Sequence, residues 1–233
     1  IKLVSKNLQN SEQNVPILFL PWECRGSHHW DKQMRYFSKR GIPTYSFSHS
    51  EDGLDEMERE LKQAVEEIGT TDLVLIGRSM GAFVVQRYLC SNPAIGAVLI
   101  DPFPPDPTEM ATEIAKEVFE CETHEIGNIF KNDRNICSTL LKEVFTESIW
   151  FTTEKKTKQI FFDFPIKSFR QMMHEKSIVE GEAETNKMLI VSTDMTEMAS
   201  PQIALDTAHF HSAAITWVKS EKVLWETVHK WYS

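Results

Sequence analysis

Apolar residues follow two alternating periods through the first 107 residues. Short apolar runs that suit buried strands occur over 15–20, 43–47, 73–76 and 94–100. Between them, apolar residues recur every three or four positions, which predicts helices over 30–40, 54–68 and 82–90. The helix over 54–68 has the clearest pattern, with one apolar face, one charged face and Gly69 as its end. Strands that alternate with helices predict the α/β class, with a mostly parallel central sheet flanked by helices.

This alternation stops at residues 101–107, where four of seven residues are prolines. Proline fixes the backbone and removes a donor, so neither a strand nor a helix continues through this segment. Residues 108–186 then read mainly as helices rich in aromatic side chains, before a strand at 187–192 and a terminal helix at 222–232. We therefore predict a core formed by 1–107 and 187–233, with 108–186 inserted as a helical cap.

Composition and charge narrow the partners. The net charge of -9 disfavours nucleic acid and anionic membrane surfaces, because both would repel the chain. The sequence has no apolar run near the roughly 20 residues that a membrane span needs. A small-molecule substrate is the expected partner, and the sequence predicts no oligomeric state.

The four cysteines contain no Cys-x-x-Cys pair and predict neither a zinc site nor a disulfide scaffold. Free thiols favour a reducing compartment, so we expect a cytoplasmic protein, although the start at Ile1 leaves a removed leader open.

One short motif carries most of the chemical information. Gly77-Arg-Ser-Met-Gly81 lies directly between the strand over 73–76 and the helix that follows. A Gly-x-Ser-x-Gly turn in this setting is typical of a nucleophile elbow, in which the serine hydroxyl stands above the edge of a sheet. The two glycines let the backbone pack closely at the sharp bend. Ser79 is therefore the candidate nucleophile.

The motif and its surroundings resemble the α/β-hydrolase superfamily over most of the chain. The similar features are the elbow, the segment Ile17-Leu-Phe-Leu-Pro-Trp-Glu-Cys-Arg-Gly26 with the helix after it, the proline-rich exit before a cap, and the late strand. The resemblance implies an α/β-hydrolase fold with an inserted helical cap and serine-hydrolase chemistry. Such chemistry requires no metal and no organic cofactor.

The resemblance also implies an oxyanion hole built from two backbone amides. One would belong to Met80, directly after the nucleophile, and the other to the loop 21–23, with Glu23 as the best match and Trp22 beside it. This loop departs from the family, because Pro21-Trp22 stands where a His-Gly pair is usual. The bulky Trp22 side chain predicts a narrowed or rebuilt hole.

The triad acid has three candidates. The family places an acid after the strand at 188–192, and Asp194 follows that strand directly. Registering Ser200-Pro201 on the end of the acid loop puts Thr196 in the usual Asp position, with Asp194 and Glu197 on either side. Asp101 is the third candidate, since some family members carry the acid after the preceding strand. We prefer Asp194.

Two registers compete for the histidine. In the first, Ala208-His209-Phe210 resembles the family's histidine segment, and His209 is the base, with His211 as the fallback. In the second, 201–211 is a helix, 213–218 is the last strand, and the histidine slot falls at Lys219-Ser220, which contain no histidine. We prefer His209 on the local motif, although the short spacing from Asp194 favours the second register.

Two functions follow from these alternatives. The leading one is a serine hydrolase that cleaves a small, mostly apolar carboxylic ester or thioester through an acyl-enzyme on Ser79. The other is a degenerate hydrolase-fold protein that binds a small molecule, or supports non-hydrolytic chemistry, in the same pocket. The departures at Pro21-Trp22, Thr196 and the histidine slot motivate it.

Overall fold

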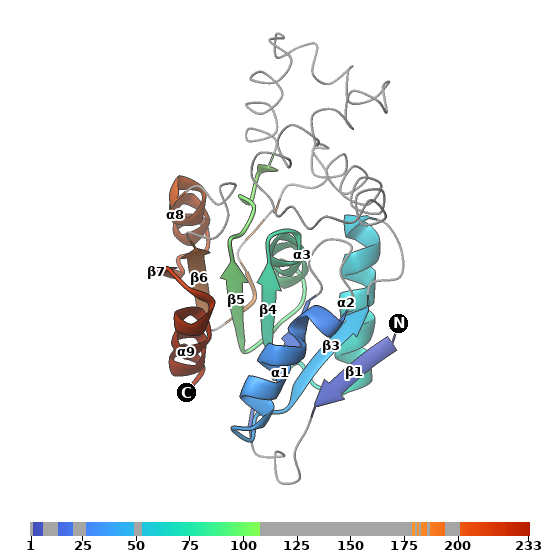
Figure 1. Ribbon diagram of the computed structural model, residues 1–233. Coiled ribbons are helices and arrows are strands. Elements are labelled where there is room, and N and C mark those ends of the chain that lie inside the picture. Colours follow the sequence, from blue (N-terminus) through green and yellow to red (C-terminus); the bar gives the residue numbers. More distant parts are fainter. Residues whose placement is uncertain are drawn as a thin grey trace, which may run out of the picture.

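The computed structural model describes residues 2–6, 14–20, 27–48, 53–107, 179, 181, 183–185, 187–193 and 201–233 (Figure 1). Nearly all of the predicted cap over 108–186 lies outside the described residues. So do the candidate oxyanion residues Trp22 and Glu23 and the candidate acids Asp194 and Glu197.

The described core is built on a seven-stranded sheet in the order β1-β3-β2-β4-β5-β6-β7. Its strands are β1 (Lys2–Lys6), β2 (Ile17–Phe19), β3 (Thr44–Ser48), β4 (Val74–Arg78), β5 (Gly96–Ile100), β6 (Met188–Thr193) and β7 (Ala214–Val218). The strands β2 to β7 pair in parallel, and β1 pairs antiparallel with β3 at one edge. This arrangement confirms the predicted mostly parallel sheet. The apolar pattern did not predict β1, whose lysines and exposed positions are those of a short edge strand.

Helices cover both faces of this sheet (Figure 1). They are α1 (Asp31–Ser38), which follows the 3-10 turn η1 (Ser27–Trp30), α2 (Leu54–Ile68), α3 (Met80–Leu89), α8 (Pro201–Phe210) and α9 (Glu221–Tyr232). The helix α2 has the bounds that the apolar period predicts, and Gly69 ends it in the left-handed conformation. Helix α3 begins two residues before the predicted start, because the elbow leads into it directly.

Alternate residues of each strand enter two separate hydrophobic cores. On one face, Leu18, Leu75 and Leu99 pack with α2, α3 and α8. On the other, Phe19, Ile76 and Ile100 pack with α1 and α9. All five residues of β5 are buried, as expected of a central parallel strand that helices cover on both sides.

The turn from β4 into α3 depends on Gly77. A Cβ atom added there would lie 2.5 Å from the carbonyl oxygen of Gly81 and 2.7 Å from the amide nitrogen of Ala82. Both contacts are with backbone, so no side chain can rotate away to relieve them. Glycine at 77 therefore allows the first turn of α3 to fold back against the end of β4.

We predict that Gly77→Ala destabilises the fold by about 2–3 kcal/mol, the cost of overpacking against an unyielding backbone. The matched control is Gly69→Ala, whose Cβ would meet no atom within 4 Å. The control carries only the penalty of a left-handed alanine, about 1 kcal/mol. Urea unfolding of the three proteins measures both losses. Equal losses in the two variants would contradict the steric role of Gly77.

Candidate functional site

Ser79 lies at the carboxyl end of the parallel strands, directly after β4. Because β2, β4, β5, β6 and β7 run parallel, their carboxyl ends lie at the same end of the sheet. The segments that leave this end are the elbow after β4, Asp101 after β5, the loop 194–200 after β6 and Lys219 after β7. Strand β2, which leads to the loop 21–26, is the direct neighbour of β4. The topology thus places Ser79, Met80 and Asp101 at the same end of the central strands.

Ser79 has a backbone conformation that non-glycine residues rarely adopt. Its φ is 51° and its ψ is -118°, a combination outside the regions favoured for L-residues. Its amide donates a hydrogen bond of 2.9 Å to the carbonyl of Ile100, which ties the elbow to the end of β5. The serine is neither fully buried nor fully exposed. Strain of this kind persists only where the surrounding structure enforces it, and it is concentrated at functional sites.

Met80 is the first residue of α3, directly after Ser79. The first amides of a helix have no carbonyl partner within it, and the helix dipole places partial positive charge there. The Met80 amide thus lies at the positive end of α3, while its side chain is buried in the core. Its predicted partners, Glu23 and Trp22, lie outside the described residues.

Asp101 is the one candidate acid that the structure describes. Its carboxylate accepts hydrogen bonds of 2.7 Å from both the amide and the hydroxyl of Thr193. It also lies 3.2 Å from a guanidinium nitrogen of Arg78. Burial raises the pKa of Asp101, while Arg78 and the two bonds from Thr193 oppose that rise. Its φ of 45° adds a second strained residue at this end of the sheet.

The cluster Arg78-Asp101-Thr193 joins the ends of β4, β5 and β6. Sequence reasoning did not assign Arg78 or Thr193 a role. The sequence signal that could have indicated this cluster was a polar residue at the end of each of these three apolar strands. A triad acid would accept a hydrogen bond from the imidazole of the base. Among the described residues, the side chains that donate to Asp101 are those of Thr193 and Arg78.

The structure gives His209 an exposed position near the end of α8. His209 is the ninth residue of α8 and its side chain is exposed. Only three residues separate the end of α8 from the first residue of β7. Through the register of β4, β5, β6 and β7, Ala214 at the start of β7 lies level with Ile76 of β4. Within the described residues, no hydrogen bond joins His209 to Ser79.

The elements at the end of the chain follow the second of the two registers, with a helix over 201–210 and a last strand over 214–218. After β7, only Lys219 and Ser220 precede α9. The Ser220 hydroxyl accepts a bond of 3.4 Å from the Val223 amide and caps the helix. This turn is short and carries no histidine.

His211 has a structural partner instead. Its Nε2 lies 3.0 Å from the side-chain oxygen of Gln86, a fully buried residue of α3. The amide nitrogen of Gln86 donates to the Phe103 carbonyl at 2.9 Å, so its oxygen is the acceptor and His211 Nε2 is the donor. Burial lowers the pKa of His211 to about 4. The bond links the connection between α8 and β7 to α3.

Two other described histidines lie on the segment that follows β2, the direct neighbour of β4. His28 and His29 belong to η1, which follows the loop 21–26 and precedes α1. Ser27, beside them, contacts Ser48 at the end of β3, with 3.2 Å between the two hydroxyl oxygens. Both imidazoles are exposed, with ring centroids 4.1 Å apart. These two imidazoles therefore follow a strand whose carboxyl end lies beside that of β4.

We predict that His211 makes the fold less stable in acid. Its pKa is about 4 in the folded protein and near 6.5 in the unfolded chain, so the unfolded chain binds the proton more readily between these values. Stability from this group is complete above pH 6.5 and falls as the pH drops toward 4. His211→Asn, which keeps a donor for Gln86, should flatten this part of the curve of unfolding free energy against pH. The control is His209→Asn, at an exposed position of α8, which should leave the curve unchanged.

The described residues contain no group of three or more side chains suited to hold a metal ion. Among the same residues, none of the helices has the length and apolar character to cross a membrane.

Comparison with known proteins gives a likeness of structure. No family model matches the sequence, and no curated protein does. Among solved structures, an esterase from Exiguobacterium antarcticum matches with a TM-score of 0.60 at 10% identity, covering 99% of this chain and 95% of the esterase. The haloalkane dehalogenase DbeA from Bradyrhizobium elkani matches with a TM-score of 0.64 at 12% identity, covering 99% and 92%.

An N-acyl homoserine lactone degrading enzyme also matches, with a TM-score of 0.60 at 13% identity over 98% of this chain and 95% of that one. These proteins share an architecture with this chain over nearly its full length. Their sequence identities of 10–13% indicate a common fold and do not indicate a common substrate. With its mostly parallel sheet and flanking helices, the chain has the α/β-hydrolase fold.

Proposed function

We propose that this protein is a serine hydrolase that cleaves a small, mostly apolar carboxylic ester or thioester through an acyl-enzyme on Ser79. The observation that carries the proposal is the conformation of Ser79, with φ at 51° and ψ at -118°. Such strain costs about 1–3 kcal/mol and has no use in a plain turn, where glycine would remove it. It is useful where a hydroxyl must stand clear of the backbone at the end of a strand.

In the proposed reaction, the Ser79 oxygen attacks the carbonyl carbon of the substrate as its proton passes to a general base. The amide of Met80 and one amide of the loop 21–23, with Glu23 as the best match, stabilise the oxyanion. The bond to the leaving alcohol or thiol breaks as the base returns the proton to it. Water then attacks the acyl-enzyme, which releases the acid and restores Ser79.

The general base has three candidates among the described histidines. The sequence motif favours His209, oriented by Asp194, but the exposed position of His209 on α8 argues against a direct contact with Ser79. His28 and His29, in η1, are the alternatives from the described residues. Asp101 remains the second candidate acid, and its bonds from Arg78 and Thr193 suit a residue that holds this end of the sheet together.

A second function is favoured by the turn after β7. That turn consists of Lys219 and the helix cap Ser220. In the second register these two residues occupy the position of the catalytic histidine, and neither has an imidazole. A protein that keeps the pocket and lacks the base would bind a small carbonyl compound without hydrolysing it. The two functions differ in whether Ser79 is activated.

Labelling with a fluorophosphonate probe distinguishes them. We expect the probe to label the wild-type protein and not Ser79→Ala, and short p-nitrophenyl esters to be hydrolysed only by the wild type. Ser79→Ala retains a side chain of similar size and should unfold at a similar urea concentration. Absence of both labelling and turnover in the folded wild type would reject the hydrolase and favour the binding protein.

Alanine substitution identifies the base. Removal of a triad base lowers kcat by about 10³-fold or more, with only a small change in KM. From the position of His209, we expect His209→Ala to keep the wild-type rate, and a loss of that size in this variant would restore His209 as the base. His28→Ala and His29→Ala are the matched comparisons, since both side chains are also exposed.

A further inference from the structure

The two edges of the sheet differ in how they meet solvent. Strand β1 carries Lys2 and Lys6 at its ends, and charged residues on an edge strand discourage pairing with another chain. Strand β7, at the other edge, reads Ala-Ile-Thr-Trp-Val and has no charged residue. Both strands are outermost in the sheet. Of these two edge strands, only β7 has no charged residue that would discourage pairing with another chain.

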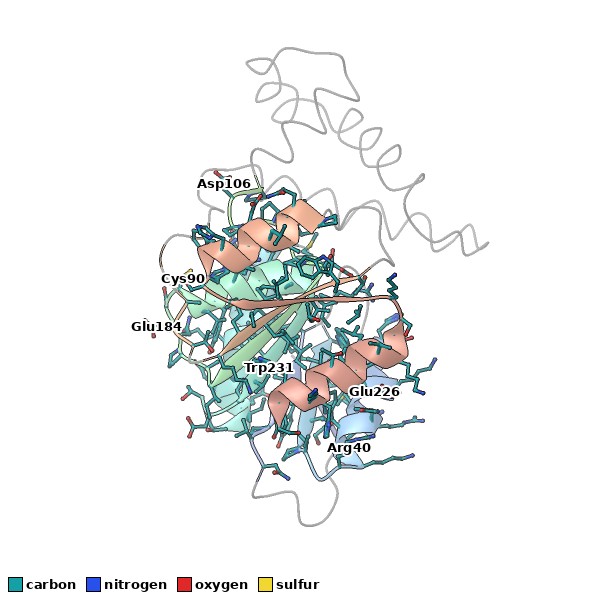
Figure 2. All side chains as sticks on the ribbon, turned by 90° about the vertical axis from the view of Figure 1, so that its left-hand side faces the viewer. Arg40, Cys90, Asp106, Glu184, Glu226 and Trp231 are labelled. Carbon is teal, nitrogen blue, oxygen red and sulfur yellow. The ribbon has the colours of Figure 1, made fainter. Side chains whose placement is uncertain are left out.

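Exposed apolar side chains gather around β7. The large hydrophobic residues that are exposed in the described part of the chain all belong to the last three elements: Leu205 and Phe210 on α8, Trp217 on β7 and Val223 on α9. Trp217 is 48% exposed, which is unusual for so large an apolar side chain. Figure 2 looks onto this edge, with β7 between α8 and α9. An apolar patch around an open strand marks an interaction site.

The sequence of β7 suits pairing with itself. In an antiparallel pair about a twofold axis at Thr216, Ile215 of one copy lies opposite Trp217 of the other, and Ala214 lies opposite Val218. Aromatic and β-branched side chains form favourable cross-strand pairs. Ile215 packs against the core that includes α8, and Trp217 shares its face because alternate residues of a strand point the same way. The two Ile-Trp pairs would therefore lie beside Leu205 and Phe210 of both copies.

We propose that the edge formed by β7, α8 and α9 is the interface of a homodimer, in which β7 pairs antiparallel with β7 of a second copy. A stable dimer buries about 800 Å² on each subunit, more than one five-residue strand supplies. The exposed apolar residues of α8 and α9 extend the contact on the two faces of the joined sheet. A closed twofold contact also leaves no free edge of β7 for further growth.

Sedimentation velocity from micromolar to submillimolar concentration tests the interface. We expect the wild type to be a dimer, and Trp217→Lys to raise the dimer dissociation constant by roughly 30-fold or more, as loss of an interface hot spot does. The matched control is Ser5→Lys, which adds the same charge at an exposed position of the opposite edge strand and should leave the dimer intact. Circular dichroism must show that both variants are folded. A wild type that stays monomeric over this range, or a dimer that Trp217→Lys leaves unchanged, would overturn the proposal.

Cross-linking gives an independent readout that does not depend on destabilising the strand. In the proposed register Thr216 lies opposite Thr216 of the second copy, so Thr216→Cys should form a covalent dimer under mild oxidation. Ser5→Cys and the wild type give the background from other thiols. Cross-linking of Thr216→Cys no stronger than this background would count against the register and the interface.

Discussion

The backbone at Ser79 is the constraint on which the candidate site depends. Two features hold it in place: the hydrogen bond from its amide to the Ile100 carbonyl at the end of β5, and the close approach of Gly77 to Gly81. The first joins the elbow to the neighbouring strand, and the second lets α3 begin without a gap. Without either, a serine with φ near 51° would relax toward an ordinary turn. The strain is thus maintained by the sheet and by α3 together.

The same end of the sheet contains a second constraint, at Asp101. Asp101, also with a positive φ, binds Thr193 and Arg78 and so ties together the ends of three neighbouring strands. Arg78 directly precedes Ser79, which makes this cluster continuous with the elbow. A carboxylate that holds strand ends together in this way is well suited to fix the geometry of this end of the sheet. Both of its oxygens already accept a bond from Thr193, and one of them also accepts a bond from Arg78.

At the end of the chain, the local histidine motif is part of a packed helix. Ala208-His209-Phe210 resembles a catalytic-histidine segment, but these residues complete a helix whose buried face is formed by Ala204, Thr207 and Ala208. Packing of that face against the core puts His209 on the exposed side. Two residues further on, His211 is partly buried against Gln86, and burial lowers its pKa. Three residues of sequence are too few to decide which side of a helix meets the core.

The sequence alone determined most of the elements between residues 15 and 107, and their order. Periodicity records which side of each segment is buried, so α2 was predicted to the residue, and the strands β2 to β6 were predicted to within two residues at either end. The Gly-x-Ser-x-Gly turn was also predictable, because its chemistry is local: one bend and two glycines.

Tertiary structure decided what depends on contacts between distant segments. It set the antiparallel edge strand β1, the cluster of Arg78, Asp101 and Thr193, and the exposure of His209 on α8. It also revealed the apolar edge around β7, since exposure is a property of the assembled sheet. A hydrogen bond between residues about 90 positions apart leaves no periodic trace in either segment, and for that reason the sequence did not predict it.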